Sequence, residues 1–151
     1  MTRTLKVQVI KATDLAVRDF ISSDPYVILT LGNHMRRTSV KNNDLNPVWK
    51  EAFTFPVENT DSSLLKVELW DDDTWRRDDK MGDAEIDLKP LFEKQAKHKK
   101  VLSPCKDNCL YKDSSIFQYE NGRKTQEVWL KLRNVESGSL NLQMEWTLPS
   151  T

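Results

Sequence analysis

Several features that would place the chain in a particular class are scarce or missing. No apolar run approaches the roughly 20 residues of a membrane-spanning helix, and Met1 is followed by Thr-Arg-Thr-Leu-Lys rather than by the apolar core of a signal peptide. Cys105 and Cys109 are the only cysteines, and with His98 nearby they supply too few ligands for a structural zinc site. There is no Asn-x-Ser/Thr sequon. We therefore expect a soluble protein with reduced thiols that starts in the cytosol.

An excess of charge of one sign is also absent. Lys plus Arg and Asp plus Glu number 23 each, so the formal net charge at pH 7 is zero. A balanced chain has no overall field that would attract nucleic acid or hold anionic lipid constitutively. We expect no nucleic-acid partner, and any function based on charge must come from local clusters.

A repeated alternation of apolar and polar residues is the main pattern that is present. A period of two predicts half-buried strands, and the turn-rich segments between them are typical of an antiparallel sandwich. The chain of 151 residues has the length of one domain. We predict an all-β, eight-stranded, two-sheet sandwich over residues 1–151. The alternation is clearest at 5–9, 27–31, 53–55, 65–69, 128–132 and 140–146.

One region departs from this pattern. Residues 89–100 lack β-branched alternation and begin with Lys89-Pro90, which predicts a short helix with proline in its first turn. Residues 103–125 are polar and irregular, and a compact domain rarely carries a structureless loop of that length. We interpret residues 89–125 as a helix-containing insertion before the last two strands.

Two acidic clusters lie between predicted strands. Carboxylates gathered at one end of a sandwich repel one another unless a cation lies between them, and Ca²⁺ prefers hard oxygen ligands on flexible loops. As the strand before them ends, Asp71 and Asp73 project to one side and Asp72 to the other, which makes Asp72 the weaker candidate. The clusters consist of Asp19 and Asp24, and of Asp71, Asp72, Asp73, Asp78 and Asp79.

Large apolar groups and cations stand on the same two loops. The first loop carries Phe20 and Ile21, and the second carries Trp75, Arg76 and Arg77. An exposed apolar tip beside basic residues is suited to entering a lipid headgroup layer, where tryptophan is favoured. The alternative is that the aromatic side chains fold back onto the core.

Three motifs resemble the hallmarks of C2 domains in their order and spacing. They are Ser-Asp-Pro-Tyr-Val at 23–27, Asn-Pro-Val-Trp at 46–49, and Asp-Asp-Asp at 71–73 followed by Asp-Lys-Met-Gly at 79–82. Residues 81–92, 107–110 and 132–138, with the closing Glu145-Trp146, resemble the plant C2-domain abscisic-acid-related proteins. This resemblance covers nearly the whole chain.

The resemblance implies loops at one end of the sandwich that bind Ca²⁺ and an anionic phospholipid membrane. Carried over residue by residue, it implies the metal ligands Asp19, Asp24, Asp71, Asp73 and Asp79. It also implies a protein in the cytoplasm and at the plasma membrane, with the nucleus left open. The implied partner is a signalling protein, either a hormone receptor of the abscisic acid class or a small GTPase that the chain regulates.

The strand after Gly32 differs from the family pattern. Family members commonly carry several lysines there that contact inositol lipid headgroups, whereas this chain retains Arg37, helped by Arg36 and Lys41. The alternative is that these are solvated charges on an edge strand.

The insertion carries aromatic and aliphatic side chains suited to a protein interface, and we predict a partner-binding surface there. The alternative is that they cover an open end of the sandwich. The residues are Leu110, Tyr111, Ile116, Phe117 and Tyr119.

Two other functions stay open. One is a calcium-insensitive interaction module that binds through the insertion. The other is an enzyme, but neither His34 nor His98 has a nucleophile motif or a Gly-rich phosphate loop beside it. We therefore expect no catalysis by this chain alone.

Overall fold

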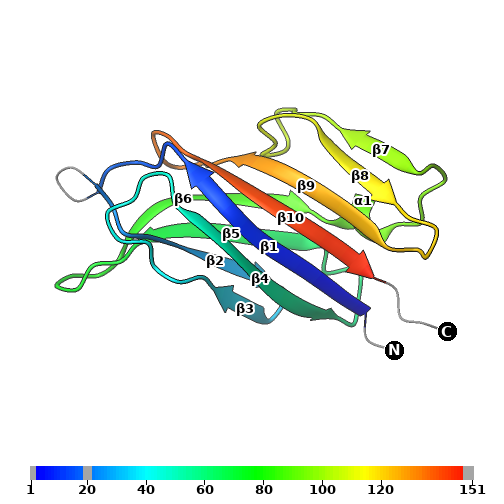
Figure 1. The fold of residues 1–151 in the computed structure, drawn as a ribbon, viewed down its shortest axis with the longest axis horizontal. Helices are drawn as coiled ribbons and strands as arrows, with labels where there is room; N and C mark the ends of the chain where they lie inside the picture. The colour runs from blue at the N-terminus through cyan, green and yellow to red at the C-terminus, as the bar shows by residue number, and fades with distance from the viewer. Residues whose placement is uncertain (1–2, 19–21, 148–151) are drawn as a thin grey trace.

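The computed structural model describes residues 3–18 and 22–147. These residues form ten strands and one short helix (Figure 1). The elements are β1 (Arg3–Thr13), β2 (Pro25–Leu31), β3 (His34–Arg37), β4 (Val48–Val57), β5 (Leu64–Asp71), β6 (Asp79–Asp87), α1 (Lys89–Phe92), β7 (Lys99–Leu102), β8 (Ser114–Gln118), β9 (Lys124–Lys131) and β10 (Ser139–Thr147).

The strands form two antiparallel sheets, which confirms the predicted all-β sandwich. One sheet has the order β4-β1-β10-β9-β8-β7 and the other has the order β3-β2-β5-β6. The eight expected strands are β1 to β6, β9 and β10. The insertion adds β7 and β8, which extend the larger sheet at one edge (Figure 1).

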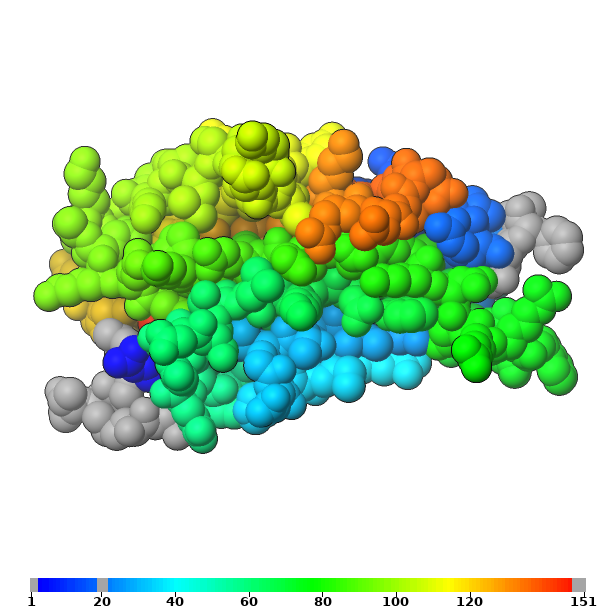
Figure 2. Space-filling view, turned by 180° about the vertical axis from the view of Figure 1, so that it is seen from behind, coloured from blue at the N-terminus to red at the C-terminus, as the bar shows by residue number. Residues whose placement is uncertain are grey.

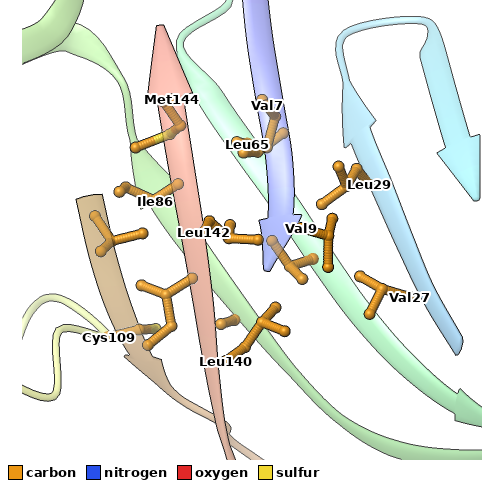
Figure 3. Packing of buried hydrophobic residues seen from close by; sticks show 14 of the residues in the cluster. Val7, Val9, Val27, Leu29, Leu65, Ile86, Cys109, Leu140, Leu142 and Met144 are labelled. Atoms are coloured by element: carbon orange, nitrogen blue, oxygen red, sulfur yellow. The ribbon is translucent and has the colours of Figure 1, made fainter. Parts of the chain in front are cut away.

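Alternating side chains of both sheets make one hydrophobic core. Val9 of β1 points toward Val27 and Leu29 of β2, and these three side chains are completely buried, as is Val7 (Figure 3). This is the packing that the period-two pattern predicts, because every second residue of a strand lies on the same face.

The helix is shorter than predicted. It ends at Phe92, and Glu93 has an extended backbone with φ −74° and ψ 151°. The following residues include Lys94, Lys97 and the basic run 98–100, so they offer no apolar face that a longer helix could bury. Residues Lys99–Leu102 instead pair with Ser114–Gln118 as strands β7 and β8.

The pairing of β5 with β6 contains an irregularity close to the acidic loops. Glu68 pairs with Asp83, but Trp70 pairs with Lys80, so β6 carries one residue more than β5 between these pairs. Gly82 lies in this bulge with φ +113°, a backbone conformation that residues other than glycine rarely adopt.

Candidate functional site

Three of the predicted metal ligands lie at the ends of adjacent strands in the smaller sheet. Asp24 immediately precedes β2, Asp71 is the last residue of β5, and Asp79 is the first residue of β6. Pro25 pairs with Asp71, and Asp71 pairs with Asp79. The sheet register therefore places these three residues in a row at the neighbouring ends of β2, β5 and β6.

Hydrogen bonds from backbone N–H groups hold two members of this row, Asp71 and Asp24. Asp71 is completely buried, and its Oδ1 accepts the backbone N–H of Asp24 at 2.7 Å. The Oδ1 of Asp24 accepts the backbone N–H of Asn43 at 2.7 Å, and its carbonyl accepts the N–H of Asp72 at 2.9 Å. Carboxylates that accept backbone N–H groups have fixed positions, which favours a preformed site over a disordered acidic loop.

The loop between β5 and β6 is closed by its own carboxylates. Asp73 Oδ1 accepts the backbone N–H groups of Trp75 at 2.9 Å and Arg76 at 3.2 Å. The N–H of Asp73 in turn donates to Asp78 Oδ1 at 3.0 Å. Asp73 thus directs one oxygen into the turn.

Tyr26 supports this loop and was not predicted as a site residue. Its hydroxyl donates to Asp78 Oδ2. Burial, together with this bond, raises the pKa of Tyr26 to about 12. The same bond and the N–H of Asp73 lower the pKa of Asp78. The signal that could have identified Tyr26 is its place in the Ser-Asp-Pro-Tyr-Val motif, directly beside Asp24 and Pro25.

A cation that the sequence analysis missed lies beside the carboxylates. The hydrogen bond from Arg18 to Glu136, with an N–O distance of 2.9 Å, raises the pKa of Arg18. The negative charges of Asp79 and Asp71 add to this rise. Arg18 therefore offsets part of the repulsion in the acidic row.

The donor set fits Ca²⁺ in its chemistry, because it consists of carboxylate oxygens on loops. Asp19, the fifth predicted ligand, lies outside the described residues. Within residues 3–18 and 22–147, no three His, Cys, Asp or Glu side chains converge closely enough to hold a metal ion. The structure thus brings Asp24, Asp71 and Asp79 onto neighbouring strand ends without assembling a complete coordination shell.

The tip of the second acidic loop is open to solvent. Trp75 is 92% exposed, and Arg76 and Arg77 are also exposed. The indole therefore does not fold back onto the core. Phe20 and Ile21, the predicted tip of the first loop, lie outside the described residues.

The three residues predicted to contact lipid headgroups do not share one face. The Arg37 guanidinium lies over the Tyr26 ring, 3.8 Å from its centroid. Arg36 points to the other side of β3, where it donates to the Thr54 carbonyl at 3.0 Å and lies over Phe55. Grouping Arg36 with Arg37 was wrong, since successive strand residues face opposite ways. Lys41 is half-buried.

The predicted partner-binding residues are divided between the core and the surface. Ile116 is completely buried, so assigning it to an interface was wrong: its strand alternation turns it inward. Leu110 is half-buried and packs against the core. Tyr111, Phe117 and Tyr119 are exposed by 63%, 43% and 44%. Of the five predicted residues, these three remain available to a partner.

No helix among the described residues is long and apolar enough to cross a membrane. A two-sheet antiparallel sandwich with acidic loops at the ends of adjacent strands is the arrangement of a C2 domain. The C2 domain family model matches residues 3–103, and the chain belongs to this family of non-catalytic binding modules.

Similarity within the family extends beyond the matched region. The chain is 39% identical to Protein C2-DOMAIN ABA-RELATED 6 of Arabidopsis thaliana, over 94% of this chain and 86% of that protein. It is 43% identical to the ADP-ribosylation factor GTPase-activating protein AGD12 of Arabidopsis thaliana, over 94% of this chain but only 44% of that protein.

A solved structure of C2 domains has a similar fold. The calcium-bound pair of C2 domains of Extended-Synaptotagmin 2 matches with a TM-score of 0.67 and 27% identity, over 95% of this chain and 45% of that one.

Proposed function

We propose that this chain is a Ca²⁺-dependent module that docks reversibly on anionic phospholipid membranes. The observation that carries the proposal is the row of Asp24, Asp71 and Asp79 on adjacent strand ends, close in sequence to the exposed tip at Trp75. Acidic side chains alone repel anionic lipid, whereas an apolar tip flanked by Arg76 and Arg77 favours it. The two features are compatible if the acidic charge is neutralised when docking occurs.

Bound Ca²⁺ would supply positive charge and open coordination positions for lipid phosphate oxygens. Asp24, Asp71, Asp73 and Asp79, together with Asp19, are the residues proposed to hold it. Because membrane and metal then favour each other, membrane should raise the affinity for Ca²⁺ by the same factor by which Ca²⁺ raises the affinity for membrane. A relative's calcium-bound structure supports this proposal.

Calorimetry on the double variant Asp71→Asn, Asp73→Asn tests the metal assignment. We expect a severe loss of Ca²⁺ uptake, with no loss of stability in the absence of Ca²⁺, because fewer charges then repel one another. The matched control is Asp61→Asn with Asp113→Asn, two exposed residues outside the acidic loops. Unchanged Ca²⁺ uptake by the first variant would overturn the assignment.

Liposome cosedimentation tests the role of the tip. Trp75→Ala, alone and with Phe20→Ala, should leave Ca²⁺ binding intact but weaken sedimentation with phosphatidylserine vesicles. Burying one large side chain is worth about 1.5–3 kcal/mol, which is roughly a 10- to 150-fold change in affinity. Tyr111→Ala, an exposed aromatic outside the acidic loops, is the control. Wild-type sedimentation by the doubly substituted protein would mean that docking is purely electrostatic.

We also propose that the docked module recruits a signalling protein through Tyr111, Phe117 and Tyr119. An abscisic acid receptor is the first candidate, supported by the name of the relative Protein C2-DOMAIN ABA-RELATED 6. Regulation of a small GTPase is the alternative, supported by the name of AGD12. Tyr111→Ala with Phe117→Ala should abolish binding of the purified partner while vesicle binding persists. Unchanged partner binding would place the interface elsewhere.

A further inference from the structure

A pocket of about 370 Å³ lies at the end of the sandwich away from the acidic loops. Arg3 begins β1, Lys124 begins β9, and Trp146 is near the end of β10, so the pocket is at the end of the sandwich where β1 begins and β10 ends (Figure 1). Its volume is at the lower end of the range for small-molecule sites, about 300–1,000 Å³. Its walls are Arg3, Phe92, Glu93, Lys94, Gln118, Gly122, Lys124 and Trp146.

Lys124 is the unusual member of this pocket, because it is a lysine only 5% exposed. It lies on the inner side of β9, in the same alternation that buries Gln126 and Val128. Its Nζ donates to the carbonyl of Glu93, its one hydrogen bond among the described residues. An ammonium group has three donors, so two remain for another acceptor.

Burial lowers the pKa of Lys124, and the positive charge of Lys100 lowers it further. A buried cation is costly unless an anion or several hydrogen bonds compensate it. The carbonyl of Glu93 and the negative charge of its side chain, which raises the pKa of Lys124, provide only part of that compensation, since the pKa is lowered on balance.

The rest of the pocket combines an apolar wall with a basic rim. The rings of Phe92 and Trp146 pack with their centroids 4.3 Å apart, and Trp146 is almost completely buried. The lining contains three cationic residues, Arg3, Lys94 and Lys124, and one acidic residue, Glu93. The segment 93–100 beside the rim protrudes from the surface at the opposite end from the loop at residues 72–78 (Figure 2).

From this juxtaposition we propose that the pocket binds a single-chain anionic amphiphile. Its phosphate monoester or carboxylate head would lie against Lys124, Lys94 and Arg3, and its apolar chain against Phe92 and Trp146. The head would supply the acceptors that the buried ammonium lacks, and the chain would cover apolar surface.

This site is separate from the calcium end. Strand β1 runs from Arg3 to Thr13 between the two ends of the sheet, and 11 residues at about 3.3 Å each span roughly 35 Å. The inference does not rest on calcium-dependent docking, and neither ligand needs the other.

Titration of the full chain with decyl phosphate tests the proposal, with EGTA present and below the micellar concentration. Tryptophan fluorescence and calorimetry should show saturable 1:1 binding. Decyltrimethylammonium, with the same chain and the opposite charge, should not bind. Inorganic phosphate should bind at least tenfold more weakly, which distinguishes an amphiphile site from a site for the free anion. Equal binding of the cationic amphiphile, or of inorganic phosphate and decyl phosphate, would overturn the proposal.

The variants locate the site. Lys124→Met keeps an unbranched side chain only one atom shorter and should weaken decyl phosphate binding at least tenfold, while Lys66→Gln, an exposed lysine elsewhere, should change nothing. Unchanged affinity of Lys124→Met would overturn the proposal. If Lys124→Met does not fold, the double variant Lys94→Gln, Arg3→Gln tests the site instead. A loss of decyl phosphate affinity smaller than threefold in that variant would refute the proposal. The calcium-site double variant should bind decyl phosphate like wild type; a loss there would place the ligand at the acidic loops and overturn the assignment.

Discussion

Replacing Tyr26 with phenylalanine should loosen the second acidic loop without disturbing the core. Tyr26 is only 4% exposed, and phenylalanine retains its ring. The substitution removes only the hydroxyl that donates to Asp78, leaving Asp78 with the N–H of Asp73. The effect of this change therefore reports on one hydrogen bond.

The expected loss of stability follows from the negative charge on the acceptor, the Asp78 carboxylate. A hydrogen bond to a charged group contributes about 1.5–3 kcal/mol to stability. Asp78 is only half-buried, so we expect the lower end of that range. In a domain of this length, about 1.5 kcal/mol corresponds to a fall in Tm of roughly 3–6 °C. Calcium affinity should fall several-fold as well, since Asp78 holds the backbone of Asp73.

Urea unfolding without Ca²⁺ measures the change in the free energy of unfolding. A double-mutant cycle with Asp78→Asn separates the hydrogen bond from other effects of each substitution. We expect a coupling energy of about 1 kcal/mol or more. If Tyr26→Phe is as stable as wild type, or the two changes are simply additive, the bond does not hold the loop and this reasoning fails.

Two further predictions concern Gly82 in the bulge and its neighbour Asp83. Burial would raise the pKa of Asp83, but hydrogen bonds from Asn134 and Lys80 outweigh burial and lower it. Its contribution is therefore present above its ordinary pKa of 3.8 and is lost as pH falls through the lower folded value. Asp83→Asn should cost about 1–3 kcal/mol at pH 7 and flatten acid unfolding curves; an unchanged pH profile would contradict this. Gly82→Ala should destabilise the protein by at least about 1–3 kcal/mol, because the added Cβ would lie 2.7 Å from Val135 Cγ1; a variant with the wild-type Tm would show that the bulge relaxes freely.

The sandwich could be predicted from the sequence because burial repeats along each strand. Leu5, Val7 and Val9 show the alternation directly, and the structure buries all three. The added strands β7 and β8 could not be predicted in the same way. They are only 4 and 5 residues long, and strands this short carry little alternation.

The candidate site also contains residues that can be recognised from the sequence and one that cannot. Asp24, Asp71 and Asp79 are recognisable because they stand in motifs at strand ends. Arg18 is not recognisable, because its partner Glu136 is 118 positions away in the chain. Local sequence patterns carry no information on a contact between residues so far apart in the chain. The Arg18–Glu136 pair is recognised only in the folded structure, where the two loops lie next to each other.

The bulge between β5 and β6 decides which charge Asp71 meets across the sheet. From Leu64 to Glu68 the position numbers of each pair add up to 151, and continuing that register would set Asp71 against Lys80. The extra residue at the bulge shifts the frame by one, and Asp71 meets Asp79 instead. An ion pair is thereby exchanged for two like charges. The proposed cation site thus depends on the bulge in β6 as much as on its aspartates, because a regular ladder with every residue of β6 retained would replace the carboxylate pair with a salt bridge.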